Sequence, residues 1–151
     1  MLKIQEQAEV FRLGMIIGIF EPSEAIAWAD RVIGEEAKPD NAILEVSMAA
    51  GANTAAMVSL LRDAAGEHTP GKPRDVLFGI LAQQLSKNQA DAPAIAAQLK
   101  TLRSAYDAPD AAMLKAAELA GPFGHDDDQA ATRALADFLA PYAKHAAEWR
   151  A

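Results

Sequence analysis

Glycines and prolines interrupt this sequence at short intervals, and their spacing limits the length of every element that the chain can form. The 151 residues include 9 glycines and 8 prolines. Most stretches between them carry apolar residues three and four positions apart, the spacing of one helix face. Alanine, the strongest helix former, supplies 35 residues, whereas aromatic residues, which favour strands, make up 6%. The sequence therefore predicts a chain of short α-helices.

We expect seven or eight helices, most of them starting near a proline or a capping residue. Ser23, Asn53 or Thr54, Asp91, Asp110 and Asp127 are the expected helix starts. Pro141 lacks an amide donor and should kink or divide the last helix. The expected segments are about 4–20, 23–34, 40–51, 53–66, 73–85, 91–106, 109–120 and 127–142.

Because helix, short turn and helix recur along the chain, we predict an all-α fold in one domain, residues 1–151. The loop Glu67 to Pro73 divides the chain near its middle, but it is short for a domain linker. Pro73 and Pro109 each open a helical hairpin 36 residues apart, a spacing found in helical repeats. No repeat signature recurs, so we expect an irregular bundle of successive helical hairpins.

Two segments also fit a buried strand. Residues 13–20 are apolar on every side, which predicts a central position in the fold. Within them Gly14 and Gly18 would share one helix face and permit a tight helix crossing. Residues 42–48 alternate between apolar and polar side chains, but Ala49 to Gly51 continue and close the segment as a helix end would, so we favour a helix there.

The net charge of −7, from 14 basic and 21 acidic side chains, disfavours nucleic-acid binding. An acidic surface suits a basic protein partner instead, through electrostatic steering. The absence of cysteine excludes disulfides and thiolate sites and fits a reducing cytosol. The apolar run Leu13 to Phe20 is too short to cross a bilayer and has acidic residues before it, unlike a signal peptide. We therefore expect a soluble cytoplasmic protein.

Residues Gly66 to Pro73 match a P-loop up to the lysine, Lys72. A P-loop then needs a Ser or Thr hydroxyl for magnesium and backbone amides for phosphate. Pro73 supplies neither, and Pro70 removes another amide. We interpret this segment as a stiff surface turn that binds no nucleotide or other cofactor.

The densest cluster of metal-ligand residue types is His125, Asp126, Asp127 and Asp128. A metal site would need further ligands, and the other histidines, His68 and His145, lie at no diagnostic spacing. Acidic residues that open a helix also satisfy its free amides, and we prefer this interpretation to a metal site.

The other candidate functional residues are expected to have structural roles. His145, near Lys144 and Trp149, is typical of a surface or helix-end histidine without a nucleophile to activate. Glu35, Glu36 and Glu45 are expected on solvated helix faces. The aromatic residues that could form a binding surface are Trp28, Phe78, Tyr142 and Trp149, of which Phe78 lies off the main stripe of its helix and should face a partner or another helix.

No catalytic residue is identified, so we hypothesise a non-enzymatic protein-interaction module. An inhibitor or immunity-type protein for a basic partner would be one version. The first alternative is a small metal-dependent hydrolase that uses the cluster His125 to Asp128. The second is a homo-oligomeric structural protein with an interface at the apolar first helix or at Trp149.

Overall fold

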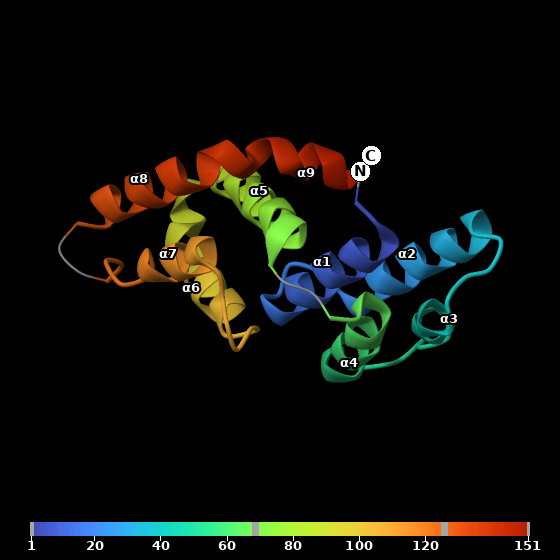
Figure 1. Cartoon of the computed structure of the whole chain (residues 1–151). Helices are drawn as coiled ribbons and strands as arrows, with labels where there is room; N and C mark the ends of the chain where they lie inside the picture. Colours follow the sequence, from blue (N-terminus) through green and yellow to red (C-terminus); the bar gives the residue numbers. More distant parts are fainter. Residues whose placement is uncertain (1, 68–69, 125–126, 151) are drawn as a thin grey trace. The chain divides into compact units, whose positions relative to one another are not determined.

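The computed structural model describes residues 2–67, 70–124 and 127–150, and within them every regular element is a helix. The all-α fold predicted from the sequence is thereby confirmed. The chain divides into two compact units, an N-terminal unit of residues 2–69 and a C-terminal unit of residues 70–151 (Figure 1). This boundary lies in the loop that divides the sequence near its middle. The single domain over residues 1–151 remains a prediction.

The N-terminal unit contains four helices whose apolar faces meet in one core. They are α1 (Ile4–Ile16), α2 (Pro22–Glu35), α3 (Asn41–Ser47) and α4 (Thr54–Ala65). Helix α1 packs mainly against α4, while α3 packs against both α2 and α4. The core side chains with no exposed surface include Val10, Leu13, Val46, Met57 and Leu61.

Helix α1 is shorter than predicted, because a glycine turn ends it at Ile16. Gly18 has a φ of 84°, which a glycine adopts without strain. Its amide donates to the Met15 carbonyl at 3.1 Å, and the Ile19 amide donates to the Gly14 carbonyl at 2.8 Å. These two bonds form a Schellman motif. The predicted helix crossing at Gly14 and Gly18 is therefore wrong: Gly18 ends the helix, and the ring of Phe20 covers Gly14.

Helix α2 begins at Pro22, and Glu21 takes the capping position that we predicted for Ser23. Proline is favoured at the first helical position because the amide it lacks would have no helical partner there. The helix also continues through Gly34 to Glu35. The strand alternative for residues 42–48 is wrong, since this segment forms α3.

The C-terminal unit contains α5 (Gly71–Lys87), α6 (Ala92–Arg103), α7 (Ala111–Glu118), α8 (Asp128–Leu139) and α9 (Ala143–Arg150). Two 3-10 turns, η1 (Gln89–Asp91) and η2 (Ala140–Tyr142), precede α6 and α9. Helix α5 packs against α8 and α9, and α6 packs against α7. Pro141 lies in η2 and divides the last predicted helix into α8 and α9, as expected.

Phe78 is the centre of the C-terminal core and has no exposed surface. Its ring lies 5.5 Å from the ring of Phe138 and 4.9 Å from that of Tyr142, both in edge-to-face arrangements. The sequence predicted that Phe78 would face either a partner or another helix. In the structure it faces another helix. Beside Phe78, the absence of a side chain at Gly79 lets the backbone of α9 approach α5 closely.

None of the described helices combines the length and the apolar composition needed to cross a membrane.

Candidate functional site

The segment resembling a P-loop does not follow a strand, which a P-loop requires. The element before it is helix α4, as predicted, and Gly71 to Pro73 already form the first turn of α5. Pro73 is buried. His68 and Thr69 lie outside the described residues. The surface turn predicted for the whole segment is therefore wrong for residues 71–73, which belong to α5, while Gly66 and Glu67 lie in the connection after α4.

The acidic cluster before α8 is only partly described, because His125 and Asp126 lie outside the described residues. The Asp127 carboxylate accepts a hydrogen bond from the Ala130 amide at 2.9 Å. The Asp128 carboxylate accepts one from the Gly124 amide at 3.1 Å. The Asp127 side chain therefore caps α8, which agrees with the helix-start interpretation, whereas the Asp128 side chain bonds to the loop that precedes the helix. Among the described residues, no three His, Asp or Glu side chains lie close enough together to hold a metal ion.

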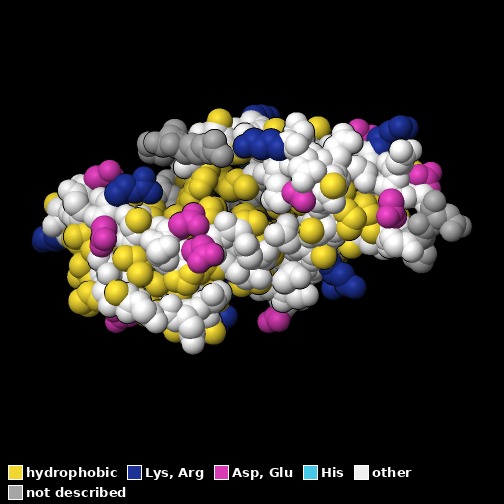
Figure 2. All heavy atoms as spheres, turned by 180° about the vertical axis from the view of Figure 1, so that it is seen from behind, with side chains coloured by type: hydrophobic (Ala, Val, Ile, Leu, Met, Phe, Trp, Pro, Cys, Tyr) yellow, Lys and Arg dark blue, Asp and Glu magenta, His cyan; other side chains and the backbone are white. Residues whose placement is uncertain are grey.

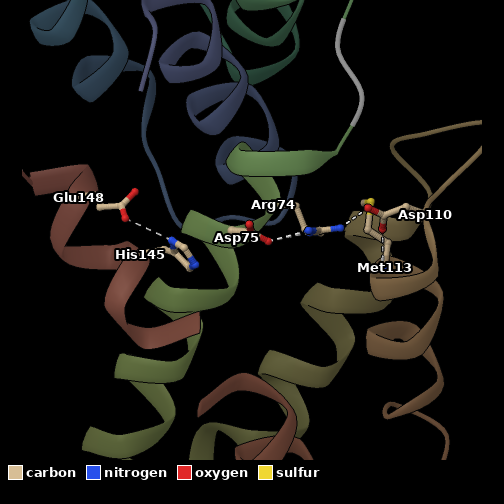
Figure 3. A network of polar contacts seen from close by, with 6 residues as sticks. All are labelled: Arg74, Asp75, Asp110, Met113, His145 and Glu148. Carbon is tan, nitrogen blue, oxygen red and sulfur yellow. Dashed lines mark hydrogen bonds and ion pairs between the residues drawn. The ribbon is translucent and has the colours of Figure 1, made fainter. Parts of the chain in front are cut away.

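A polar network joins the starts of α5 and α7 (Figure 3). The Arg74 guanidinium donates to Asp75 Oδ1 at 2.7 Å through Nη2 and forms an ion pair with Asp110 through Nη1. The other oxygen of Asp110 accepts from the Met113 amide at 3.0 Å and caps α7. Arg74 also lies 6.0 Å from the centre of the Phe78 ring. This network holds two helices together, and the residues named in it include no serine, threonine or cysteine.

Sequence reasoning predicted Asp110 as a helix start but missed Arg74. The two residues are 36 positions apart, and no local pattern relates them. Their pairing follows from the packing of the C-terminal unit.

The histidine of α9 forms a separate, local contact in Figure 3. His145 Nδ1 lies 3.5 Å from Glu148 Oε1, one turn later on the same helix. The ring centres of His145 and Tyr142 lie 6.4 Å apart. These contacts supply no serine, cysteine or threonine for His145 to activate, so they do not form a catalytic triad.

The carboxylates predicted on solvated faces are exposed. Glu35 and Glu36 lie at the end of α2, and Glu45 lies on the outer side of α3. Exposed carboxylates in similar surroundings do not have the different environments that general acid–base catalysis uses. These residues therefore contribute acidic surface and not an acid–base pair.

Two of the four aromatic candidates belong to the core. Trp28 is 2% exposed, and its indole Nε1 donates to Gln7 Oε1 at 2.7 Å. Phe78 is fully buried. Tyr142 and Trp149 are half-buried. An exposed aromatic patch with Trp28 and Phe78 at its centre is therefore excluded.

A buried ion pair within α1 also went unpredicted. Glu9 is 2% exposed and Arg12 is 7% exposed, and Arg12 Nε donates to Glu9 Oε2 at 2.8 Å. A second contact joins Arg12 Nη2 to Glu9 Oε1. The i, i+3 spacing of opposite charges was the signal that could have revealed the pair. Arg12 neutralises Glu9 within the molecule.

Each unit also has a hollow at its surface. In the N-terminal unit, a cleft of about 250 Å³ has an apolar floor that includes Ile4 and Ile43. Its rim carries two lysines and two carboxylates, namely Lys3, Lys38, Glu36 and Asp40. In the C-terminal unit, a groove of about 560 Å³ lies between η1 and α8. The opposite charges at the rim of the N-terminal cleft offset each other. The C-terminal groove is lined mainly by polar and small side chains.

The acidic excess of the chain is concentrated in its N-terminal unit. Residues 2–69 contain eleven acidic and five basic side chains, whereas residues 70–151 contain ten and nine. From Pro39 to Leu61 there are two carboxylates and no lysine or arginine. In Figure 2, hydrophobic side chains reach the surface with acidic and basic side chains among them. This unit therefore has an acidic and partly apolar surface.

No family model, no curated protein and no solved structure matches this chain.

Proposed function

We propose that this protein is a non-enzymatic interaction module whose acidic N-terminal unit binds a basic protein. The observation that carries the proposal is the unequal charge of the two units, with an excess of six acidic side chains in residues 2–69 and of one in residues 70–151. A surface of one sign accelerates the encounter with a partner of the other sign and repels competitors of its own sign. An inhibitor or immunity-type role toward a basic protein fits this chemistry.

The exposure of the acidic side chains supports the proposal. Glu35, Glu45, Asp63 and Glu67 are exposed, and they come from α2, α3, α4 and the loop after α4. A partner could reach them without a change in the fold. The buried Glu9, by contrast, is already paired with Arg12 and is not counted as binding surface.

The test is affinity capture from the source cell's extract, followed by elution with increasing salt. A basic protein released by moderate salt is expected, because salt screens attraction between exposed charges. The triple variant Glu35→Gln, Glu45→Gln and Glu67→Gln should weaken its binding roughly tenfold at low salt, since an exposed ion pair contributes up to about 1 kcal/mol.

The matched control removes three exposed charges from the C-terminal unit, through Asp107→Asn, Glu118→Gln and Asp137→Asn. It makes the same change in net charge, so it should leave the affinity nearly unchanged if the N-terminal unit is the binding surface. Equal losses in both triple variants would show that net charge alone is responsible. Capture of an acidic partner, or binding insensitive to both variants, would contradict the proposal.

The two alternative functions receive less support from the described residues. A hydrolase at residues 125–128 would need Asp127 and Asp128, whose carboxylates accept hydrogen bonds at the start of α8. A homo-oligomer through the first helix would need an exposed apolar face, whereas Val10 and Leu13 of α1 have no exposed surface. A cytoplasmic location is part of the proposal and rests on the lack of cysteine.

A further inference from the structure

We infer that the end of α3 and the turn that follows it bind an amphipathic basic segment of the partner, with Met48 as the apolar anchor. We call this region, Glu45 to Ala56, the Met48 surface. The inference rests on the proposed function and specifies where on the N-terminal unit the partner binds. It also adds a requirement for apolar residues, which attraction between charges alone would not impose.

Met48 is the most exposed large hydrophobic residue of the described chain, with 75% of its surface accessible. The other is Leu114, at 39%. Met48 ends α3, and its amide donates to the Leu44 carbonyl at 3.1 Å. Two residues earlier, Val46 is fully buried. The backbone at Met48 is therefore held by the fold, while its flexible thioether side chain is available to a partner.

Several of the residues after Met48 are small and exposed. They are Ala50 and Gly51 in the turn, and Thr54, Ala55 and Ala56 in the first turn of α4. Hydrogen bonds hold the turn, including one from the Ala52 amide to the Ala49 carbonyl at 2.9 Å. Small side chains next to one large apolar side chain would allow a partner's backbone to come close while its apolar residues cover Met48.

The charges near Met48 favour a cationic partner. Glu45 precedes Met48 by one helical turn and is exposed. Asp30 of α2 accepts a hydrogen bond from the hydroxyl of Ser47, which places a second carboxylate beside the residue that precedes Met48. No lysine or arginine occurs between Pro39 and Leu61. A segment with basic and apolar residues would thus meet carboxylates and Met48 together, whereas an acidic segment would be repelled.

Titration with synthetic peptides tests this inference on the intact protein. The first probe is a helical peptide with lysines on one face and leucines on the other; the second has glutamates in place of the lysines. A third contains the same lysines with serines in place of the leucines. We expect the lysine–leucine peptide to bind at least tenfold more tightly than either of the others.

Methyl NMR of ¹³C-methionine protein locates the bound peptide. The side chains of Met15, Met57 and Met113 are buried, so of these and Met48 only the Met48 methyl group should contact the peptide directly. Its signal should move during the titration while those three remain nearly fixed.

Substitution then measures the contribution of each residue. Met48→Ser should weaken binding about tenfold, because the partner would no longer cover a large apolar side chain at this position. Glu45→Gln should weaken it two- to threefold, a change of about 0.4–0.7 kcal/mol. Met48→Leu should retain most of the affinity. Leu114→Ser removes the other exposed hydrophobic residue from the C-terminal unit and should change nothing.

The outcomes distinguish this inference from the proposed function. If the lysine–leucine peptide binds but Met48→Ser has no effect, or Leu114→Ser has an equal effect, the Met48 surface is excluded and the acidic interaction module stands. The same holds if the lysine–serine peptide binds as tightly as the lysine–leucine peptide. If neither lysine peptide binds, and the captured partner is insensitive to the triple glutamate variant, both proposals are overturned.

Discussion

At Gly79, the backbone of α5 lies close to the backbone of η2 and α9. A Cβ atom at this position would lie 2.9 Å from the Ala146 amide nitrogen and would also overlap the Tyr142 carbonyl oxygen. Both atoms belong to the backbone, so rotation of a side chain cannot relieve the overlap. The requirement for glycine therefore comes from packing, since the φ of Gly79 is not in the left-handed region.

We predict that Gly79→Ala destabilises the protein by about 1–3 kcal/mol, the usual cost of inserting a methyl group into a packed core. Urea unfolding followed by circular dichroism measures this change. Gly34→Ala is the control, because Gly34 lies inside α2 with no neighbour within 4 Å of the added methyl group. That variant should stabilise the protein by up to about 1 kcal/mol. Equal stability of Gly79→Ala and the native protein would contradict the packing argument.

At the scale of the helix, the capping residues show which local predictions were reliable. Asn53, Asp110 and Asp127 were expected at helix starts, and each side chain accepts a hydrogen bond from the amide three residues later. Asp91 was expected to cap α6 in the same way, but it lies in η1, and its carboxylate accepts from Gln84 and Asn88 instead. A capping residue normally has a non-helical backbone, whereas Asp91 lies in a 3-10 turn with φ −79° and ψ −3°.

Asp110 has two roles at the start of α7, since one oxygen caps the helix and the other pairs with Arg74. We predict that Asp110→Ala costs about 1–2 kcal/mol, as expected for the loss of a helix cap. Asp110→Asn keeps a capping oxygen and should cost less. Asp107→Ala, an exposed position in the preceding loop, should stay within about 0.5 kcal/mol of the native protein. If Asp107→Ala were as harmful as Asp110→Ala, the cap and the ion pair would not explain the loss.

For the whole molecule, the open question is whether the two units unfold together. The sequence predicts one domain because the loop between the units is short, and we therefore expect one heat-capacity transition in scanning calorimetry. The variants Arg12→Met and Gly79→Ala place one change in each unit. Arg12→Met leaves the buried Glu9 carboxylate without its guanidinium, which should cost about 3–5 kcal/mol.

Both variants should lower the midpoint of the same transition. Arg31→Met is the control in the N-terminal unit, because Arg31 is exposed on α2 and its loss should have little effect. Two transitions, of which Arg12→Met lowers one and Gly79→Ala the other, would contradict the single-domain prediction.

Local patterns in the sequence were enough to predict the helical class, most helix starts and the division of the last helix at Pro141. These features depend on interactions within a few residues: apolar side chains at three- and four-residue spacing, carboxylates that cap nearby amides, and the missing amide of proline. The exposure of Glu45 was predicted for the same reason, since its position on the helix is set by the residues beside it.

For other residues, burial and pairing depend on how the helices pack and could not be predicted from the local sequence. The packing buries Phe78, joins Arg74 to Asp110 across 36 residues and leaves Met48 exposed at the end of α3. Gly18 also lies in the turn that ends α1, although its spacing from Gly14 would fit a helix face equally well. The reason is physical: burial and pairing depend on which elements meet in space, and several arrangements of the same helices satisfy the local pattern equally well.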